Sequence, residues 1–179
     1  MYIWAAIDIE QQLVKQKEIV KNIEKEIHFV QSNVSLLPLH VSLKISSKVQ
    51  DSDEENLRKD IEVLYRNIRP FEIEVDKIEI NETIVWIKMK ENDNLRHLHD
   101  ELCTIYLKYG IELHEFDKCF AYHSTLFLDS DKEKISDAFE QIRDIKLPKI
   151  LIANRFIIGS SPEGKIGTYS VDKTIEQSL

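Results

Sequence analysis

The stretch LPLHVSLKIS (residues 37–46) sets a histidine and a serine two positions apart within an otherwise apolar run. Successive side chains of a strand point to opposite faces, so His40 and Ser42 share one face and the alternating apolar residues share the other. The pattern therefore predicts a strand with one polar and one apolar face. Taken alone, its simplest interpretation is an ordinary half-solvated strand.

A second stretch, AYHSTLFLD (residues 121–129), repeats the arrangement with His123 and Thr125. The chain has six histidines, so chance matches to His-x-[Ser/Thr] are expected and the spacing by itself is weak evidence. The context is more specific, because each match lies in a predicted strand that follows one predicted helix and precedes another. The other four histidines make no such match.

The segments around these two strands alternate between helical and extended patterns. In the first half we expect a strand over 2–9, a helix from about 13 to 29, a break at 32–35 and a strand over 37–46. A helix over 51–68 and a hairpin of 71–80 with 83–90 should follow. In the second half we expect a helix over 92–110, a strand over 116–129, a helix over 131–145, a strand over 149–161, and a turn over 161–171 that leads into a last strand. The order predicts a single α+β domain, 1–179, made of two pseudo-repeated lobes. Antiparallel sheets should line a central cleft, with helices on the outer faces.

Two strands that face each other across a cleft would present two imidazoles and two hydroxyls to one ligand. Imidazole titrates near neutrality, so one neutral histidine can accept a proton while a second, charged histidine donates one. Serine and threonine hydroxyls can donate hydrogen bonds to the nonbridging oxygens of a phosphate. This set of groups suits the cleavage of a phosphodiester without a metal ion.

At these residues the sequence resembles the two-histidine (2H) phosphoesterase superfamily, which includes the enzymes called 2'-5' RNA ligases and cyclic nucleotide phosphodiesterases. The signature of that family is a repeated His-hydrophobic-[Ser/Thr]-hydrophobic motif, found here as HVSL at 40–43 and HSTL at 123–126. The second copy departs from the signature because Ser124 occupies a hydrophobic position. We expect looser packing at that point, or a separate hydrogen bond for Ser124.

The resemblance implies metal-independent hydrolysis, or reversible ligation, of a 2',3'-cyclic or 2'-5' phosphodiester on a nucleotide or an RNA end. It implies that His40 and His123 are the catalytic acid and base, that Ser42 and Thr125 bind the phosphate, and that no cofactor is needed. The sequence does not assign the acid and base roles between the two histidines. A different class remains open, namely a non-catalytic protein on the same fold that binds nucleotides or RNA ends.

Charge and composition restrict the substrate and the location. The net charge of −8 opposes binding to long phosphate backbones, which favours a short substrate: a nucleoside 2',3'-cyclic phosphate, a short 2'-5' oligonucleotide or a cyclic oligonucleotide. The first ten residues, MYIWAAIDIE, lack a basic leader, and no segment has the apolar length needed to cross a bilayer. We expect a cytoplasmic protein that is monomeric and does not associate with membranes.

A metal site is the main competing interpretation. His97 and His99, with His114 and Glu115 farther along, are the candidate ligands. A helix would place His97 and His99 about 200° apart, which disfavours shared coordination, so we expect no metal. His28 is expected at the surface.

The sequence also contains two cysteines and several residues that could contact a ligand. Cys103 and Cys119 are expected to be two free, buried thiols. Five aromatic residues could stack on a base, although packing within strands is favoured for each: Trp4, Trp86, Tyr122, Phe127 and Phe156. Arg155, Lys165 and Tyr169, in the C-terminal hairpin, could contact phosphate or base, although a solvated surface is the simpler explanation.

Overall fold

The computed structural model describes residues 1–29 and 37–178 of the chain. The helices in these ranges are α1 (Val14–Ile27), α2 (Glu54–Asn67), α3 (Asp93–Lys108) and α4 (Lys132–Ile142), with 3-10 turns at Glu10–Gln12 and Glu115–Asp117. The strands are β1 (Tyr2–Asp8), β2 (His40–Lys48), β3 (Phe71–Asn81), β4 (Ile84–Met89), β5 (His123–Leu128), β6 (Ile150–Ala153), β7 (Arg155–Ser161) and β8 (Ser170–Glu176). No helix within these ranges is long and apolar enough to cross a membrane.

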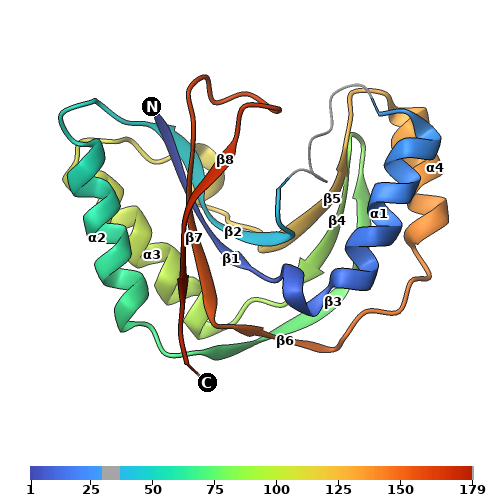
Figure 1. Cartoon of the computed structure of the whole chain (residues 1–179), viewed down its shortest axis with the longest axis horizontal. Coiled ribbons are helices and arrows are strands. Elements are labelled where there is room, and N and C mark those ends of the chain that lie inside the picture. The colour runs from blue at the N-terminus through green and yellow to red at the C-terminus, as the bar shows by residue number, and fades with distance from the viewer. Residues whose placement is uncertain (30–36, 179) are drawn as a thin grey trace.

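Two antiparallel four-stranded sheets form the two lobes. Their strand orders are β2-β1-β7-β8 and β5-β4-β3-β6. Helices α2 and α3 cover the outer face of the first sheet, and α1 and α4 cover the outer face of the second (Figure 1). The predicted α+β fold, with two antiparallel sheets lining a cleft and helices outside, is confirmed.

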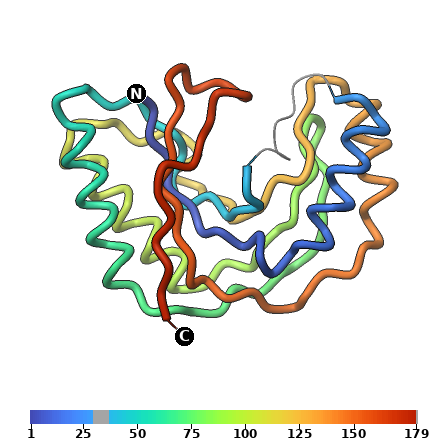
Figure 2. The backbone as a smooth tube through the Cα atoms, in the orientation of Figure 1, coloured from blue at the N-terminus to red at the C-terminus, as the bar shows by residue number. Residues whose placement is uncertain are grey.

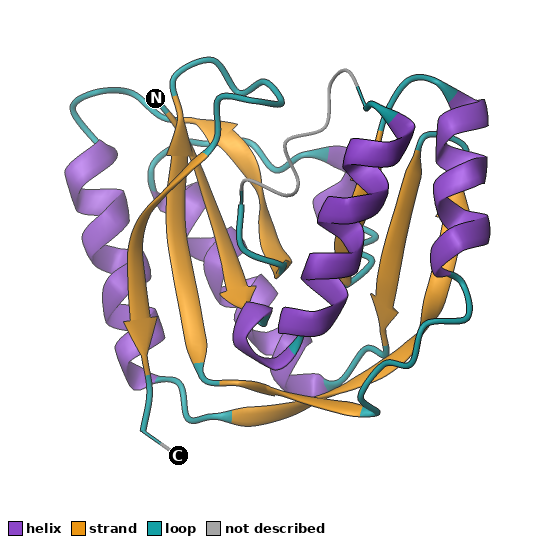
Figure 3. Cartoon of the chain, turned by 45° about the vertical axis from the view of Figure 1, so that its right-hand side comes forward, coloured by secondary structure: helices purple, strands orange, loops and turns teal. Residues whose placement is uncertain are grey.

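The lobes are interleaved along the chain. Helix α1 precedes β2 in sequence but packs with α4 on the sheet of β5, whereas α3 precedes β5 and packs on the sheet of β2 (Figure 3). The chain returns to the first lobe through β6, which runs along one end of the molecule, and then enters the sheet of the first lobe as β7 (Figure 2). As a result, β2 and β5 are both edge strands, and they lie side by side where the lobes meet.

The alternation predicted for β2 is present around its histidine. The neighbouring apolar side chains Leu39, Val41 and Leu43 are buried, and His40 and Ser42 are half-buried on the other face. The pairing of β2 with β1 then shifts, from Ala6 opposite Ser42 to Ala5 opposite Lys44.

One additional residue of β2 is accommodated at this shift, as in a β-bulge, and a bulge changes the face to which the following side chains point. Lys44, two positions after Ser42, is therefore fully buried, with its ammonium 4.8 Å from the centroid of the Tyr106 ring of α3.

Two predicted strands differ from the structure. The strand expected over 116–129 begins only at His123, because residues 115–117 form a 3-10 turn capped by His114 and Asp117. The strand expected over 149–161 is two strands separated at Asn154, since β6 pairs with β3 in one sheet and β7 pairs with β1 in the other. A run of β-forming residues does not reveal that the chain changes sheets within it.

The first helix is shorter than its apolar pattern predicts. It ends at Ile27, and His28 follows in the left-handed conformation, with φ of 58°, and is exposed, as expected. Val20 and Ile23 are buried, whereas the neighbouring Ile19 is 38% exposed. The break predicted at 32–35 lies outside the described residues.

Candidate active site

A cleft of about 530 Å³ lies between the two lobes. This volume is within the usual range for small-molecule sites. The described residues that line it are Trp4, Leu37, His40, Ser42, Lys44, Ile45, Ser46, Asn81, Ile84, Trp86, Phe116, Cys119, Phe120, Ala121, His123 and Tyr169. Both histidines singled out from the sequence are in this set, one from each lobe.

The two histidines make the same local hydrogen bond. Nδ1 of His40 lies 2.8 Å from the carbonyl oxygen of Pro38, and Nδ1 of His123 lies 2.7 Å from the carbonyl oxygen of Ala121. In both, the carbonyl belongs to the residue two positions earlier. A carbonyl oxygen can only accept, so Nδ1 carries a proton and donates it in both rings. Nε2 is then the atom of each ring that can take up or release a proton.

Burial lowers the pKa of both imidazoles. For His40 loss of hydration is the largest effect, the Pro38 carbonyl acts in the opposite direction, and the nearby His123 lowers the pKa further. For His123 burial again lowers the pKa against the raising effect of the Ala121 carbonyl. The physical reason is that an imidazolium loses more hydration energy than neutral imidazole when it leaves water.

A tryptophan from the adjacent strand packs against each histidine. The rings of Trp4, on β1, and His40 have centroids 5.0 Å apart at an interplanar angle of 44°. The rings of Trp86, on β4, and His123 have centroids 4.5 Å apart at 39°. Each tryptophan restricts its histidine on one side and contributes an aromatic wall to the cleft.

The two predicted phosphate-binding hydroxyls differ in position. Ser42 lines the cleft, whereas Thr125 is half-buried on the same face of β5 as His123 but is not among the described lining residues. Neither hydroxyl makes a hydrogen bond to another described residue. Ser124 is fully buried, and its Oγ has no hydrogen-bond partner among the described residues, so the separate hydrogen bond considered from the sequence is not found there.

Charged groups are scarce in the cleft. Among its described lining residues there is no carboxylate, and the single lysine, Lys44, is paired with Asp117 in the protein interior. Of the C-terminal candidates, Tyr169 lines the cleft, whereas Arg155 pairs with Asp8 and Glu176. A second candidate, Lys165, is exposed and pairs with Glu163. An anionic ligand would therefore meet imidazole, hydroxyl and aromatic groups.

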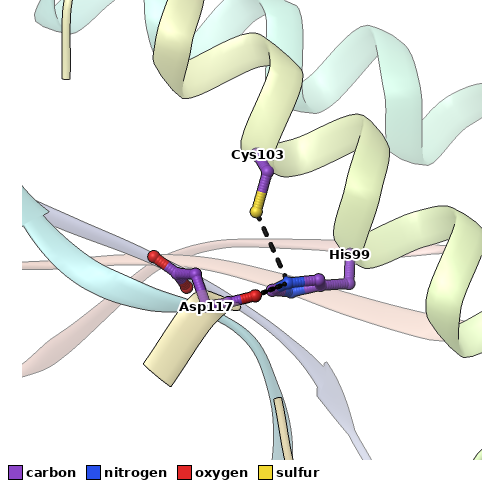
Figure 4. A group of neighbouring side chains, drawn as sticks. All are labelled: His99, Cys103 and Asp117. Carbon is purple, nitrogen blue, oxygen red and sulfur yellow. Dashed lines mark hydrogen bonds between the residues drawn. The ribbon is translucent and has the colours of Figure 1, made fainter. Parts of the chain in front are cut away.

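The alternative metal ligands do not come together as a set. His97 is exposed and His99 is buried, which agrees with their predicted separation around a helix. A different buried group consists of His99, Cys103 and Asp117 (Figure 4). The Asp117 carboxylate already has a positive partner, because Lys44 Nζ lies 2.8 Å from its Oδ2. Both ring nitrogens of His99 face backbone carbonyl oxygens. Asp117 Oδ1 is buried without a hydrogen-bond partner among the described residues, but the ammonium of Lys44 beside the same carboxylate opposes a second cation, which does not fit a metal centre.

The cleft also contains residues that the sequence pattern did not single out. Phe116, which is 61% exposed, and Phe120 lie on the segment before β5 and face the cleft. Their position within a predicted strand concealed them, because that segment is a 3-10 turn and loop. Cys119 on the same segment is exposed, so the prediction of two buried thiols is correct only for Cys103; both are free.

The other aromatic candidates divide by location. Trp4 and Trp86 line the cleft. Tyr122, Phe127 and Phe156 are buried in the core, as the packing interpretation predicts.

Known proteins are similar to this chain in sequence or in structure. A protein of Geobacillus thermodenitrificans, provisionally named a phosphoesterase, is 24% identical over 115 residues, which cover 63% of this chain and 64% of that protein, so the match spans less than two thirds of this relative. The structure of TT0787 from Thermus thermophilus matches with a TM-score of 0.66 at 15% identity over 98% of this chain and 97% of that one. The structure of E. coli LigT complexed with 3'-AMP matches with a TM-score of 0.64 at 17% identity over 99% and 98%. The model of the 2'-5' RNA ligase superfamily matches residues 13–156, and the chain therefore belongs to this superfamily of two-histidine phosphoesterases.

Proposed function

We propose that the protein is a metal-independent phosphodiesterase that hydrolyses a 2',3'-cyclic or 2'-5' phosphodiester of a nucleotide or RNA end. The observation that carries the proposal is the matched pair of Nδ1 hydrogen bonds from His40 to Pro38 and from His123 to Ala121. They leave two Nε2 atoms, one from each edge strand, to exchange protons at the cleft. A protein that only binds phosphate has no need for two such groups.

In the proposed reaction, neutral Nε2 of one histidine takes a proton from water as the water oxygen attacks phosphorus. The bond from phosphorus to the leaving ribose oxygen breaks, and protonated Nε2 of the other histidine gives its proton to that oxygen. The products are a phosphate monoester and a free ribose hydroxyl. Ser42 and Thr125 donate hydrogen bonds to the nonbridging oxygens, where negative charge increases in the transition state.

The proposed substrate is small and contains at least one base. The aromatic residues of the cleft can stack on a base, an interaction worth about 1–3 kcal/mol for each base. Electrostatic attraction contributes little to binding of a longer polyanion, because the net charge is −8 and the one lysine among the described lining residues is paired internally. Structures of the similar E. coli LigT with 3'-AMP and ATP support a nucleotide ligand. We further propose that the chain acts as a monomer.

The test is to incubate the purified protein, in EDTA, with nucleoside 2',3'-cyclic phosphates, short 2'-5' oligonucleotides and cyclic oligonucleotides, and to identify the consumed substrate. We expect turnover that does not depend on added metal. His40→Ala and His123→Ala should each lower kcat by about 100-fold or more. His97→Ala is the matched control, because His97 is exposed and does not line the cleft.

Two outcomes would contradict the proposal. Activity that disappears in EDTA would exclude the metal-independent mechanism, and near-normal rates in both histidine variants would exclude two-histidine catalysis. Binding of 3'-AMP without turnover of any of these substrates would favour the non-catalytic alternative.

A further inference from the structure

A buried group of three side chains links the strand of one proposed catalytic histidine to the segment that precedes the other. Lys44 lies on β2, four residues after His40, and Asp117 lies on the 3-10 turn, six residues before His123. Lys44 Nζ and Asp117 Oδ2 are 2.8 Å apart, and both side chains are 0% exposed. A charge pair at this depth is costly to dehydrate and is held only where its geometry is fixed by other contacts.

His99 of α3 connects the same two segments through their backbones. Its Nδ1 lies 2.7 Å from the carbonyl oxygen of Leu43 on β2, and its Nε2 lies 2.9 Å from the carbonyl oxygen of Asp117. The ring of His99 also packs against Phe120 in the cleft wall, with centroids 4.4 Å apart. The three side chains Lys44, His99 and Asp117 are called the buried clamp below.

Contacts continue from the buried clamp to the proposed site. Asp117 Oδ2 accepts a second hydrogen bond, of 2.8 Å, from the backbone N–H of His114, which fixes the beginning of the turn. The turn is followed by Phe120 and then by Ala121, whose carbonyl oxygen holds Nδ1 of His123. Displacement of this segment would change the orientation of His123 relative to His40 without removing either ring.

We propose that the buried clamp of Lys44, His99 and Asp117 is a positioning device that sets the relative placement of the two histidines across the cleft. The inference rests on the proposed function for its catalytic readout. The reason for a large effect is geometric, since a displacement of about 1 Å at a reacting group can cost about 100-fold in rate. None of the three side chains takes part in the proton transfers.

The experiment compares Lys44→Met, Asp117→Asn and the double variant. Asparagine keeps an oxygen that can accept from His114, and methionine keeps the apolar stem of the lysine. Each single variant leaves one charge of the ion pair buried without its counter-charge and should lower Tm, whereas the double variant should recover much of that loss. Lys108→Met with Asp60→Asn is the matched control, because this pair, 2.6 Å apart, joins α3 to α2 with Lys108 largely exposed.

If the buried clamp positions the histidines, kcat of the double variant stays about 10-fold or more below that of the wild-type protein although Tm recovers, and KM changes by less than about 3-fold. The control double variant keeps its kcat. Recovery of kcat together with Tm would show that the ion pair only stabilises the fold and would overturn the proposal. Single variants that are folded and fully active would also overturn it.

A thiol assay tests the buried clamp independently of turnover. Cys103 is buried beside His99, with Sγ 3.5 Å from Nε2, and burial raises the pKa of its thiol to about 11, whereas Cys119 is exposed. Ellman's reagent should modify one thiol rapidly in the wild-type protein, and in the double variant the second should react about 10-fold faster than in the wild type. Continued protection of Cys103 would show that the segment stays in place without the ion pair and would overturn the proposal. Absence of turnover by the wild-type protein would remove the proposed function and leave the thiol result to decide.

Discussion

The indole of Trp4 lies directly over Gly159 of the neighbouring strand β7, the two residues being paired across the sheet. A Cβ atom at Gly159 would come within 2.2 Å of Cε2 of Trp4 and within 2.4 Å of the carbonyl oxygen of Ser170. Trp4 in turn packs against His40. The absence of a side chain at Gly159 therefore makes room for the Trp4 indole, which packs against the proposed catalytic residue His40.

Gly159→Ala is therefore expected to displace Trp4 and to disturb His40. We expect a lower Tm and a fall in kcat of about 10-fold, read together with a change in tryptophan fluorescence. Gly110→Ala is the control, because a Cβ there meets nothing within 4 Å although its φ of 69° makes the substitution strained. Equal losses of activity in both variants would indicate general destabilisation instead of a specific effect on Trp4.

The pH dependence of kcat/KM should reflect the lowered pKa values of both histidines. Burial lowers the pKa of His40 and His123 below 6.5 in the free protein. The acid must be protonated, so kcat/KM should decrease as the pH rises through the pKa of that histidine, with the alkaline limb below pH 6.5. An anionic phosphate in the cleft stabilises the imidazolium, and the alkaline limb of kcat should lie at higher pH. An alkaline limb of kcat/KM above pH 7 would contradict this prediction.

The same pKa shifts predict a loss of folding stability in mild acid. A histidine whose pKa is lower in the folded state binds its proton more readily when the chain is unfolded. Stability should be greatest above about pH 7 and should decrease as the pH falls below 6.5. Urea unfolding at pH 7.5 and 5.5 measures the loss, which should be smaller in the His40→Asn/His123→Asn double variant. His97→Asn serves as the exposed control and should lose as much as the wild type.

Ser124→Ala is expected to stabilise the protein. The Ser124 side chain is 0% exposed and its Oγ lacks a hydrogen-bond partner among the described residues. Removal of a buried hydroxyl without a partner should raise the free energy of unfolding by about 1 kcal/mol. Thermal unfolding checks this, and kcat should be unchanged because the side chain faces away from the cleft. A lower Tm would show that Oγ is satisfied in solution by a group such as water.

The sequence predicted the elements on which the fold depends. Alternation of polar and apolar residues identified β2 and β5 as strands and placed His40, Ser42, His123 and Thr125 on one face of each, since alternation follows from the geometry of an extended backbone. The spacing of apolar residues was also sufficient to predict the helices. The exposure of Ile19 shows that such spacing does not fix how far the buried face of a helix extends.

The arrangement of the cleft walls was not readable from the sequence. Phe116 and Phe120 belong to a segment that looked like a continuous strand, and its turn depends on the capping of His114 by Asp117 and on the contact of Asp117 with Lys44, a residue 73 positions away. Likewise, local composition gave no sign that the strand over 149–161 changes sheets at Asn154. Contacts between distant segments decide both features.

The sequence by itself thus determined which residue types line two similar strands, because side-chain direction along a strand is a local property. Only the tertiary structure decided that α1 and α3 each pack on the lobe opposite to the strand they precede, that β2 and β5 become neighbouring edges, and that Lys44 is buried against Asp117. These features depend on which apolar faces are buried against each other and on a shift in strand register, which are energies of the whole fold and not of any one segment.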